Sequence, residues 1–280
     1  MLSSWTLCAV LGGTCAPQQL GQATGKSVAI GKLSDEFSVP STLSKWSRVT
    51  RTEGWNIDQT DELSIGSVRP GWLTIIPKTS TWYQDYRGEL VFKLVTGNFI
   101  VKASLDVAGK QGGPPNSNYS LAGIMLRSPR NITPQTWAPG GENYVFSSIG
   151  AADQPGTWQF EIKSTTNSDS WLQLSPATSG TAKIGIARIG TSLVLLRNAG
   201  PGWQIVFRYE RPDMPATLQS GITVYTDYSY ASTFSPFDHN STSINGGNPD
   251  LVANVDYVRY LPVPLGAGSN DAVLIAAMGD

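Results

Sequence analysis

Histidine and cysteine are almost missing from this sequence, which has one histidine, His239, and two cysteines, Cys8 and Cys15. Structural zinc sites are built from Cys and His side chains, so there are too few of these residues to form one. A Ser-His-Asp triad would have to use His239, which lies in the polar stretch "SPFDHNSTS", and no G-x-S-x-G motif is present. A bridge between the two cysteines would close only a short local loop and contribute little to the main fold.

Charge and long apolar runs are also scarce. Only 15% of the residues are charged and the formal net charge is −1, so we expect no nucleic acid or anionic membrane as a partner. No stretch reaches the roughly 18 apolar residues that a transmembrane helix needs. Residues 1–16 resemble a signal peptide but lack its positive n-region. We assign residues 1–30 to a leader or signal-like segment and, from the sequence as a whole, expect a secreted or cell-surface protein.

Aromatic and turn-forming residues are abundant, with nine Trp, ten Tyr, eight Phe, 29 Gly and 18 Pro. Apolar residues alternate with polar ones at a period of two, as in "FIVKASLDVAG" from Phe99, which is typical of a half-buried strand. About a dozen such segments follow one another with no helix between them. The pattern predicts an all-β fold, an antiparallel two-sheet jelly-roll sandwich, over residues 31–262. We interpret residues 263–280 as a linker and a short helix-like stub, where further modules of a longer parent chain would follow.

The stretch "ARIGTSLVLLRNAGPGWQIVFRYERPD", residues 187–213, is interpreted as a hairpin whose turn spans residues 198–202. Followed by "LQSGITVYTD", it resembles the end of concanavalin A-like β-sandwich domains of the DUF1349 type. The segments "SDEFSVPSTLSKW", "VTGNFIVKASLDV", "AGIMLRSP" and "VDYVRY" agree in their order, so the resemblance covers about residues 33–261. It implies a fold shared by lectins, accessory domains of glycosidases and catalytic glucanases, and therefore does not settle function.

Three functions remain open on these grounds. The resemblance implies that a glucanase of this fold would carry E-x-D-x-E on one strand, and that motif is absent. A glycoside hydrolase would then depend on Glu142 and Glu161, facing each other across neighbouring strands. A structural subunit of a cell-surface or fibrous assembly, capable of self-assembly, is a further alternative. Because Trp and Tyr rings pack against the C–H face of a pyranose, we expect a non-catalytic module whose partner is a carbohydrate or glycan.

The segment "TWYQDYRG" is the best candidate for the sugar-binding surface. On a regular strand, Tyr83, Asp85 and Arg87 point to one side, while Trp82 and Tyr86 point into the space between the sheets. Arg87 would donate to sugar hydroxyls or to a uronate while Asp85 holds its guanidinium, although a purely structural Asp–Arg pair is an equal alternative. Further ligand-binding residues expected on the same face are Arg127, Tyr144, Glu161 and Lys163, with Glu142 beside them and Trp137 and Trp171 as walls.

A structural calcium ion is implied by the family resemblance at the point where the first and last strands of the sandwich meet. Asp35 opens the first strand and Asp256 lies in the last one. Carboxylate oxygens are the hard ligands that Ca²⁺ prefers. The alternative is that both aspartates are simply solvated.

Overall fold

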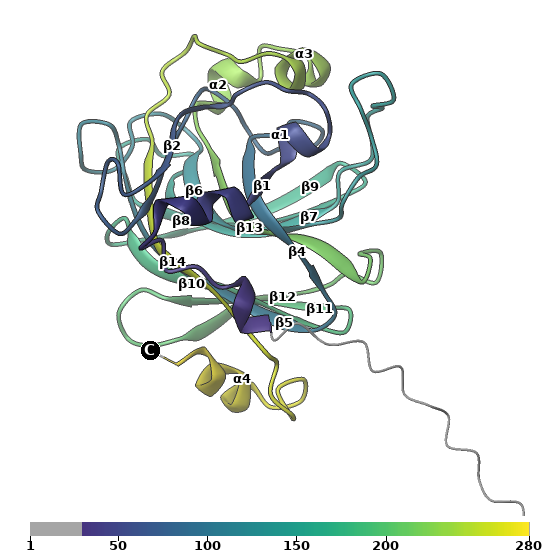
Figure 1. Ribbon diagram of the computed structural model, residues 1–280. Coiled ribbons are helices and arrows are strands. Elements are labelled where there is room, and N and C mark those ends of the chain that lie inside the picture. Colours follow the sequence, from purple (N-terminus) through teal and green to yellow (C-terminus); the bar gives the residue numbers. More distant parts are fainter. Residues whose placement is uncertain (1–29, 280) are drawn as a thin grey trace, which may run out of the picture.

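Two antiparallel seven-stranded sheets, packed face to face, make up the described part of the chain, residues 30–279, in a computed structural model (Figure 1). The first sheet has the strand order β1 (Ser47–Arg48), β4 (Glu89–Thr96), β13 (Thr217–Tyr225), β6 (Ser120–Arg127), β7 (Tyr144–Ala151), β8 (Gln159–Thr166) and β9 (Asp169–Pro176). The second sheet has the order β12 (Gln204–Glu210), β11 (Ser192–Asn198), β10 (Thr181–Ile189), β5 (Phe99–Ala108), β14 (Val252–Leu261), β3 (Leu73–Pro77) and β2 (Thr60–Ile65). The predicted all-β sandwich is confirmed.

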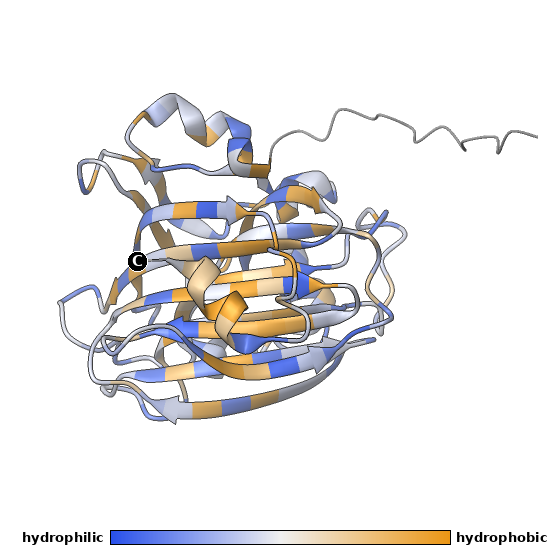
Figure 2. Cartoon of the chain, turned by 90° about the horizontal axis from the view of Figure 1, so that it is seen from below, coloured by the Kyte–Doolittle hydropathy of each residue, from blue (hydrophilic) through white to orange (hydrophobic). Residues whose placement is uncertain are grey.

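The main hydrophobic core fills the space between the sheets, because each strand directs alternate residues inward. In β5, Phe99, Val101, Ala103 and Leu105 are fully buried in this core, as the period-two pattern predicts. Figure 2 shows the same alternation of hydrophobic and hydrophilic residues along the strands of the second sheet. The alternation of side chains therefore determines which residues of each strand pack between the two sheets and which lie on the outer face of the sheet, where helices and loops can cover them.

The hairpin after β10 forms as expected, although it begins later than the sequence suggests. Gly190, at φ 63°, separates β10 from β11, so the long apolar run is two strands. β11 ends at Asn198 and β12 begins at Gln204, and the Asn198 side-chain oxygen accepts hydrogen bonds from the backbone N–H groups of Gly200 and Gly202. Both glycines have positive φ, so the turn conformation disfavours any other residue type there.

The outer face of the second sheet is covered by helix α4 (Asp271–Met278), which lies below that sheet in Figure 1 and across its front in Figure 2. Leu274 and Met278 are buried in a cluster that includes Ile100, Val194 and Trp203. The short helix-like stub expected at the end of the chain is thus a helix, and its apolar residues pack on the sandwich. Of the described helices, none is both long and apolar enough to cross a membrane.

The outer face of the first sheet is covered by α1 (Val49–Thr52), α2 (Tyr228–Ala231), α3 (Pro236–Ser241) and the loop of residues 79–88, and Figure 1 shows the three helices above that sheet. A second apolar cluster lies beneath this cover and contains Trp82, Tyr144, Phe146 and Tyr225. The chain enters the sandwich through two 3₁₀ helices, η1 (Ile30–Leu33) and η2 (Pro40–Lys45). The leader residues 1–29, with Cys8 and Cys15, lie outside the described residues.

Candidate functional site

The loop of residues 79–88 replaces the regular strand expected for "TWYQDYRG". Gln84 has φ 52°, and Tyr83 and Tyr86 pair with each other in an isolated bridge, so the chain turns here instead of alternating. Trp82 is buried on the outer face of the first sheet, where its ring packs edge-on to Tyr144 at 5.3 Å. Tyr86 packs edge-on to His239 of α3 (Pro236–Ser241) at 5.2 Å. The expectation that Trp82 and Tyr86 point between the sheets is therefore wrong, because the period-two argument requires a strand that does not form.

Helix α3 holds this loop in place through two adjacent side chains. The His239 Nε2 atom accepts a hydrogen bond from the Thr81 backbone N–H at 3.2 Å. The Asn240 side-chain oxygen accepts from the Arg87 backbone N–H at 2.9 Å, and its amide nitrogen donates to the Asp85 carbonyl at 2.8 Å. Burial lowers the pKa of His239 to about 4, so its imidazole is neutral near pH 7 and free to act as an acceptor. The loop conformation thus depends on a residue that sequence analysis placed in a polar loop.

Asp85 and Arg87 do not pair with each other. The Asp85 carboxylate accepts hydrogen bonds from the Gly140 backbone N–H at 2.9 Å and from the Ser168 hydroxyl. Arg87 forms an ion pair with Glu53 and is only 3% exposed. Both sequence hypotheses for this pair, a sugar-binding fork and a structural Asp–Arg pair, are therefore corrected: the turn sends the two side chains to different partners.

A buried network of charges surrounds Arg127 on the outer face of the first sheet. Arg127 donates to both oxygens of Glu142 at 2.7 and 2.9 Å and contacts Glu53 at 2.8 Å, and Arg130 contacts Glu142 at 2.7 Å. Burial would raise the pKa of Glu142, but the charges of Arg127, Arg87 and Arg130 outweigh it and hold the pKa at about 2. These charges neutralise one another away from solvent, so the geometry gives Arg87 and Arg127 a structural role instead of access to a ligand.

Glu142 and Glu161 do not face each other. In the register of β7 and β8, Ser148 lies opposite Glu161, whereas Glu142 precedes β7 by two residues. The Glu161 carboxylate is instead bound by the Lys163 ammonium at 2.8 Å and by the Tyr225 hydroxyl at 2.6 Å. The carboxylate pair on which the hydrolase alternative depends is therefore not formed by these two residues.

A small pocket, the tyrosine pocket, opens on the outer face of the first sheet beside the loop of residues 79–88. Its volume is about 170 Å³. Its lining residues are Thr81, Tyr83, Tyr119, Lys163, Leu172 and Tyr228. Lys163 and Leu172 are partners in the register of β8 and β9, and they share the face opposite the main core. The Tyr228 ring packs edge-on to Tyr83 at 5.9 Å and to Tyr119 at 5.5 Å. Of the expected ligand-binding residues, the structure brings Tyr83 and Lys163 together here.

Lys163 places a positive charge in the wall of the tyrosine pocket. Its ammonium donates to the Trp82 carbonyl and to Glu161, both at 2.8 Å, and lies 5.6 Å from the centre of the Tyr83 ring. Burial lowers the pKa of Lys163, while the carboxylate of Glu161 opposes that shift. An ammonium has three donors, and these two acceptors use two of them. Lys163 itself is only 1% exposed.

The other expected residues lie elsewhere. Tyr144 is fully buried and stacked on Phe146 beneath the cover. Trp137 packs against Trp55 and Phe237 and does not line the tyrosine pocket. Trp171 is 48% exposed and contacts Phe207 and Tyr209 of β12, because it projects from the face of β9 opposite to Leu172.

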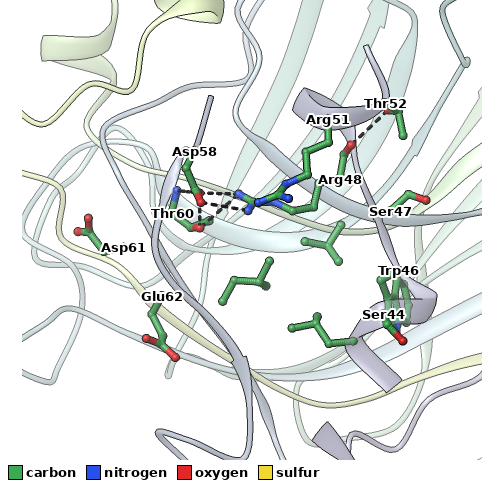
Figure 3. Close-up of a pocket in the computed structure, with 13 residues that line it drawn as sticks. Ser44, Trp46, Ser47, Arg48, Arg51, Thr52, Asp58, Thr60, Asp61 and Glu62 are labelled. Atoms are coloured by element: carbon green, nitrogen blue, oxygen red, sulfur yellow. Dashed lines mark hydrogen bonds and ion pairs between the residues drawn. The ribbon is translucent and has the colours of Figure 1, made fainter. Parts of the chain in front are cut away.

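A second cleft, the edge cleft, was not found by sequence analysis, and it lies between the β1–α1 segment and β2 (Figure 3). Its volume is about 750 Å³ and its apolar lining includes Leu43, Leu63 and Val91. Arg48 forms ion pairs with Asp58 of the same cleft and with the buried Glu89, so the charge of this arginine is already paired. Its single tryptophan, Trp46, is 8% exposed. The edge cleft therefore lacks an open ring for stacking, and we favour the tyrosine pocket as the candidate site.

The place expected for calcium, where the first and last segments of the sandwich meet, is occupied by hydrogen-bonded side chains. Asp35 forms a bridge with Val258 of β14, so the two ends of the sandwich meet as expected. The Asp35 carboxylate, however, accepts hydrogen bonds from the Phe37 backbone N–H and the Trp46 indole N–H at 3.0 and 2.9 Å. Across residues 30–279 no three His, Cys, Asp or Glu side chains gather into a metal-ligating group. Asp35 and Asp256 do not fit the six to eight oxygens that Ca²⁺ takes.

Comparison with protein families and curated proteins gives no match to this chain. The resemblance to DUF1349-type domains therefore stays a prediction.

Solved structures do match in fold. The GH43 BlXynB protein from Bacillus licheniformis aligns with a TM-score of 0.55 at 14% identity, covering 82% of this chain and 39% of that one. A xylan beta-1,4-xylosidase from Bacillus halodurans aligns with a TM-score of 0.53 at 15% identity, covering 88% and 41%. A functionally unknown protein from Saccharomyces cerevisiae aligns at 0.51 and 14% identity, covering 80% and 99%. The chain thus spans about two fifths of the length of the two Bacillus proteins, and the similarity is one of fold.

Proposed function

We propose that this protein is a non-catalytic carbohydrate-binding module and that the tyrosine pocket takes a single sugar ring. The observation that carries the proposal is the group of three tyrosines, Tyr83, Tyr119 and Tyr228, around the Lys163 ammonium. Aromatic faces pack on the C–H groups of a pyranose, and phenol and ammonium groups hydrogen-bond its hydroxyls. Both kinds of contact are available within one pocket.

The size of the pocket supports one ring over a chain. A volume of about 170 Å³ corresponds to the space of five or six water molecules at roughly 30 Å³ each. It is below the range of about 300–1,000 Å³ that is usual for larger ligands. The pocket therefore suits the end of a glycan or a branch residue, with the rest of the ligand in solvent.

The fold similarity guides the choice of ligand and location. One matching structure is a xylan beta-1,4-xylosidase, which makes xylan the first polysaccharide to test. A glycan-binding role also favours a secreted or cell-surface protein, as the sequence predicts.

A glycan array followed by calorimetry on the best ligand tests the proposal. Tyr228→Ala removes a ring that contacts both other tyrosines, and we expect its affinity to fall tenfold or more while the protein stays folded. The matched control is Tyr230→Ala, which changes an exposed tyrosine of the same helix outside the pocket and should bind as the unchanged protein does. Wild-type affinity in folded Tyr228→Ala would reject this site.

The same samples separate the alternatives. Turnover of xylan or β-glucan that is lost in Glu161→Gln would support a hydrolase, since Glu161 is the acid closest to Lys163. Large particles in light scattering, with no glycan bound, would support a structural subunit. A binding module stays small and releases its ligand unchanged.

A further inference from the structure

Arg197, near the end of β11, is a half-buried arginine that forms no ion pair with any residue of the described chain. Its guanidinium stacks on the Phe160 ring, 3.8 Å from the ring centre, and donates to the Ser175 hydroxyl at 3.2 Å. Burial lowers its pKa and no carboxylate offsets the shift. A partly desolvated guanidinium of this kind has donors left for an anion.

Arg188 shows how the fold satisfies an arginine without an acid. It too has a pKa lowered by burial alone, but it donates to the backbone carbonyls of Ala216 and Gly190. Those carbonyls fix its guanidinium inside the protein. Arg197 has one neutral hydroxyl in their place, so its environment differs from that of a purely structural arginine.

Arg197 also lines a pocket of about 190 Å³, the arginine pocket. Further lining residues are Phe160, Pro176, Ala199, Pro201 and Gln204. Gln204 is the register partner of Arg197, and its side chain carries both a donor and an acceptor. The hairpin turn that forms one rim is held by the two hydrogen bonds to Asn198. Stacking and turn geometry therefore preorganise the site before a ligand arrives.

The arginine pocket lies at an open side of the sandwich. β9 and β12 are the terminal strands of the two sheets, so each has a neighbouring strand on one side only within the described residues. Along this side, Trp171 of β9 packs against Phe207 and Tyr209 of β12 and remains 48% exposed. Trp171 and Ser175 are four residues apart on one strand, or about 13 Å at 3.3 Å per residue. A cation and an open ring thus lie within the reach of one short oligosaccharide.

We propose that this side of the sandwich, residues of β9 and β12 with Arg197, is a second binding site that takes an acidic glycan. The carboxylate or sulfate group binds the Arg197 guanidinium, and a sugar ring of the same molecule packs on Trp171. The contact at Trp171 rests on the proposed carbohydrate-binding function, whereas the contact at Arg197 depends only on the charge of the ligand. An anion balances the guanidinium charge that Ser175 leaves unpaired.

Oligogalacturonate and its fully methyl-esterified form test the charge, because they differ only in the carboxylates. We expect the acid form to bind at least tenfold more tightly, with an affinity that falls as salt rises. Sulfated and unsulfated dextran repeat the comparison and distinguish a sulfate ligand from a carboxylate ligand. Equal binding of the charged and neutral forms of both glycans would overturn the proposal.

Arg197→Gln should remove the preference for the acid form, Arg197→Lys should retain part of it, and Trp171→Ala should weaken both forms. Arg259→Gln is the control, because Arg259 is an arginine on β14 that already pairs with Glu36. Circular dichroism and thermal melting show whether each variant is folded. Folded Arg197→Gln with an unchanged acid preference would overturn the site, whatever happens at Trp171.

Tyr228→Ala distinguishes the proposal for the tyrosine pocket from the proposal for the site at Arg197. If it abolishes binding of the neutral glycan but leaves the acid preference at Arg197 intact, both sites stand. If only Tyr228→Ala has an effect, the arginine site fails and the tyrosine pocket remains. If only the Arg197 variants have an effect, the tyrosine pocket fails and the charge-dependent site remains.

Discussion

The outer faces of the two sheets are covered in opposite ways. On the first sheet, loops and short helices enclose Glu53, Arg87, Arg127 and Glu142, which are at most 3% exposed and bind one another. On the second sheet, α4 covers apolar side chains such as Ile100 and Val194. Ion pairs require nearly fixed geometry in a dry environment, whereas apolar packing tolerates small shifts. The cover of the first sheet is therefore held by specific ion pairs, and the cover of the second sheet is held by apolar packing.

Arg127→Leu gives the strongest test of this contrast. It removes one partner of Glu142, which keeps Arg130, and one partner of Glu53, so we expect the free energy of unfolding to fall by about 3–5 kcal/mol in urea denaturation. The control is Arg259→Leu, whose ion pair with Glu36 is largely solvent-exposed and is expected to contribute less than about 1 kcal/mol. Equal effects of the two substitutions would show that burial of the network adds nothing.

Leu274→Ala tests the apolar cover. Leu274 is a fully buried residue of α4, and its truncation should cost about 2–3 kcal/mol, since a surface helix can relax around the cavity. Leu265→Ala, at a position 99% exposed, should leave the melting temperature unchanged. If Leu274→Ala behaves like Leu265→Ala, α4 does not pack on the sheet in solution.

We expect mild acid to destabilise the helices and loop that cover the first sheet before it destabilises the packing of α4 on the second sheet. His239 has an ordinary pKa near 6.5 and a folded-state pKa lowered to about 4. The unfolded chain therefore binds a proton at this histidine at a higher pH than the folded protein does, so the free energy of unfolding is highest above pH 6.5 and falls as pH drops from 6.5 toward 4. Between pH 7 and pH 5 we expect a loss of about 2 kcal/mol in unfolding free energy, at a pH where most carboxylates are still ionised.

The control is His239→Gln, which keeps a side-chain acceptor for Thr81 but cannot titrate. Its stability should be lower at pH 7 and should change little down to pH 5. A pH dependence like that of the unchanged protein would assign the effect to other groups.

The sandwich can be predicted from the sequence because its strands show the same alternation of apolar and polar residues. Phe99, Val101 and Ala103 are buried together for the same reason that they alternate with polar residues. The hairpin at residues 198–202 is equally local, since Gly200 and Gly202 mark its positive φ angles. Where neighbouring residues determine the structure, the prediction holds.

The candidate site is less predictable because its contacts join distant segments. Gln84 takes a positive φ that glycine usually marks, so nothing in "TWYQDYRG" signals the turn. The partner of Arg87 is Glu53, 34 residues earlier, and the loop is held by His239 and Asn240 more than 150 residues later. Tyr83 and Lys163 were identified from aromatic density and strand face alone, whereas Tyr119 and Tyr228 reach the pocket only through tertiary packing.

The position of β14 has a consequence for how the chain folds during synthesis. β14 is among the last strands of the chain, yet it lies in the middle of the second sheet, between β5 and β3. β3 joins that sheet only by pairing with β14, and β2 only by pairing with β3. Neither strand can be added to the sheet until the chain from the end of β3 to the start of β14 has been made, about 175 residues, which takes roughly 10–35 s at 5–20 residues per second. During that interval the apolar residues Leu73 and Ile75 lack their final cover, and a chaperone that shields this early segment should raise the yield of folded protein.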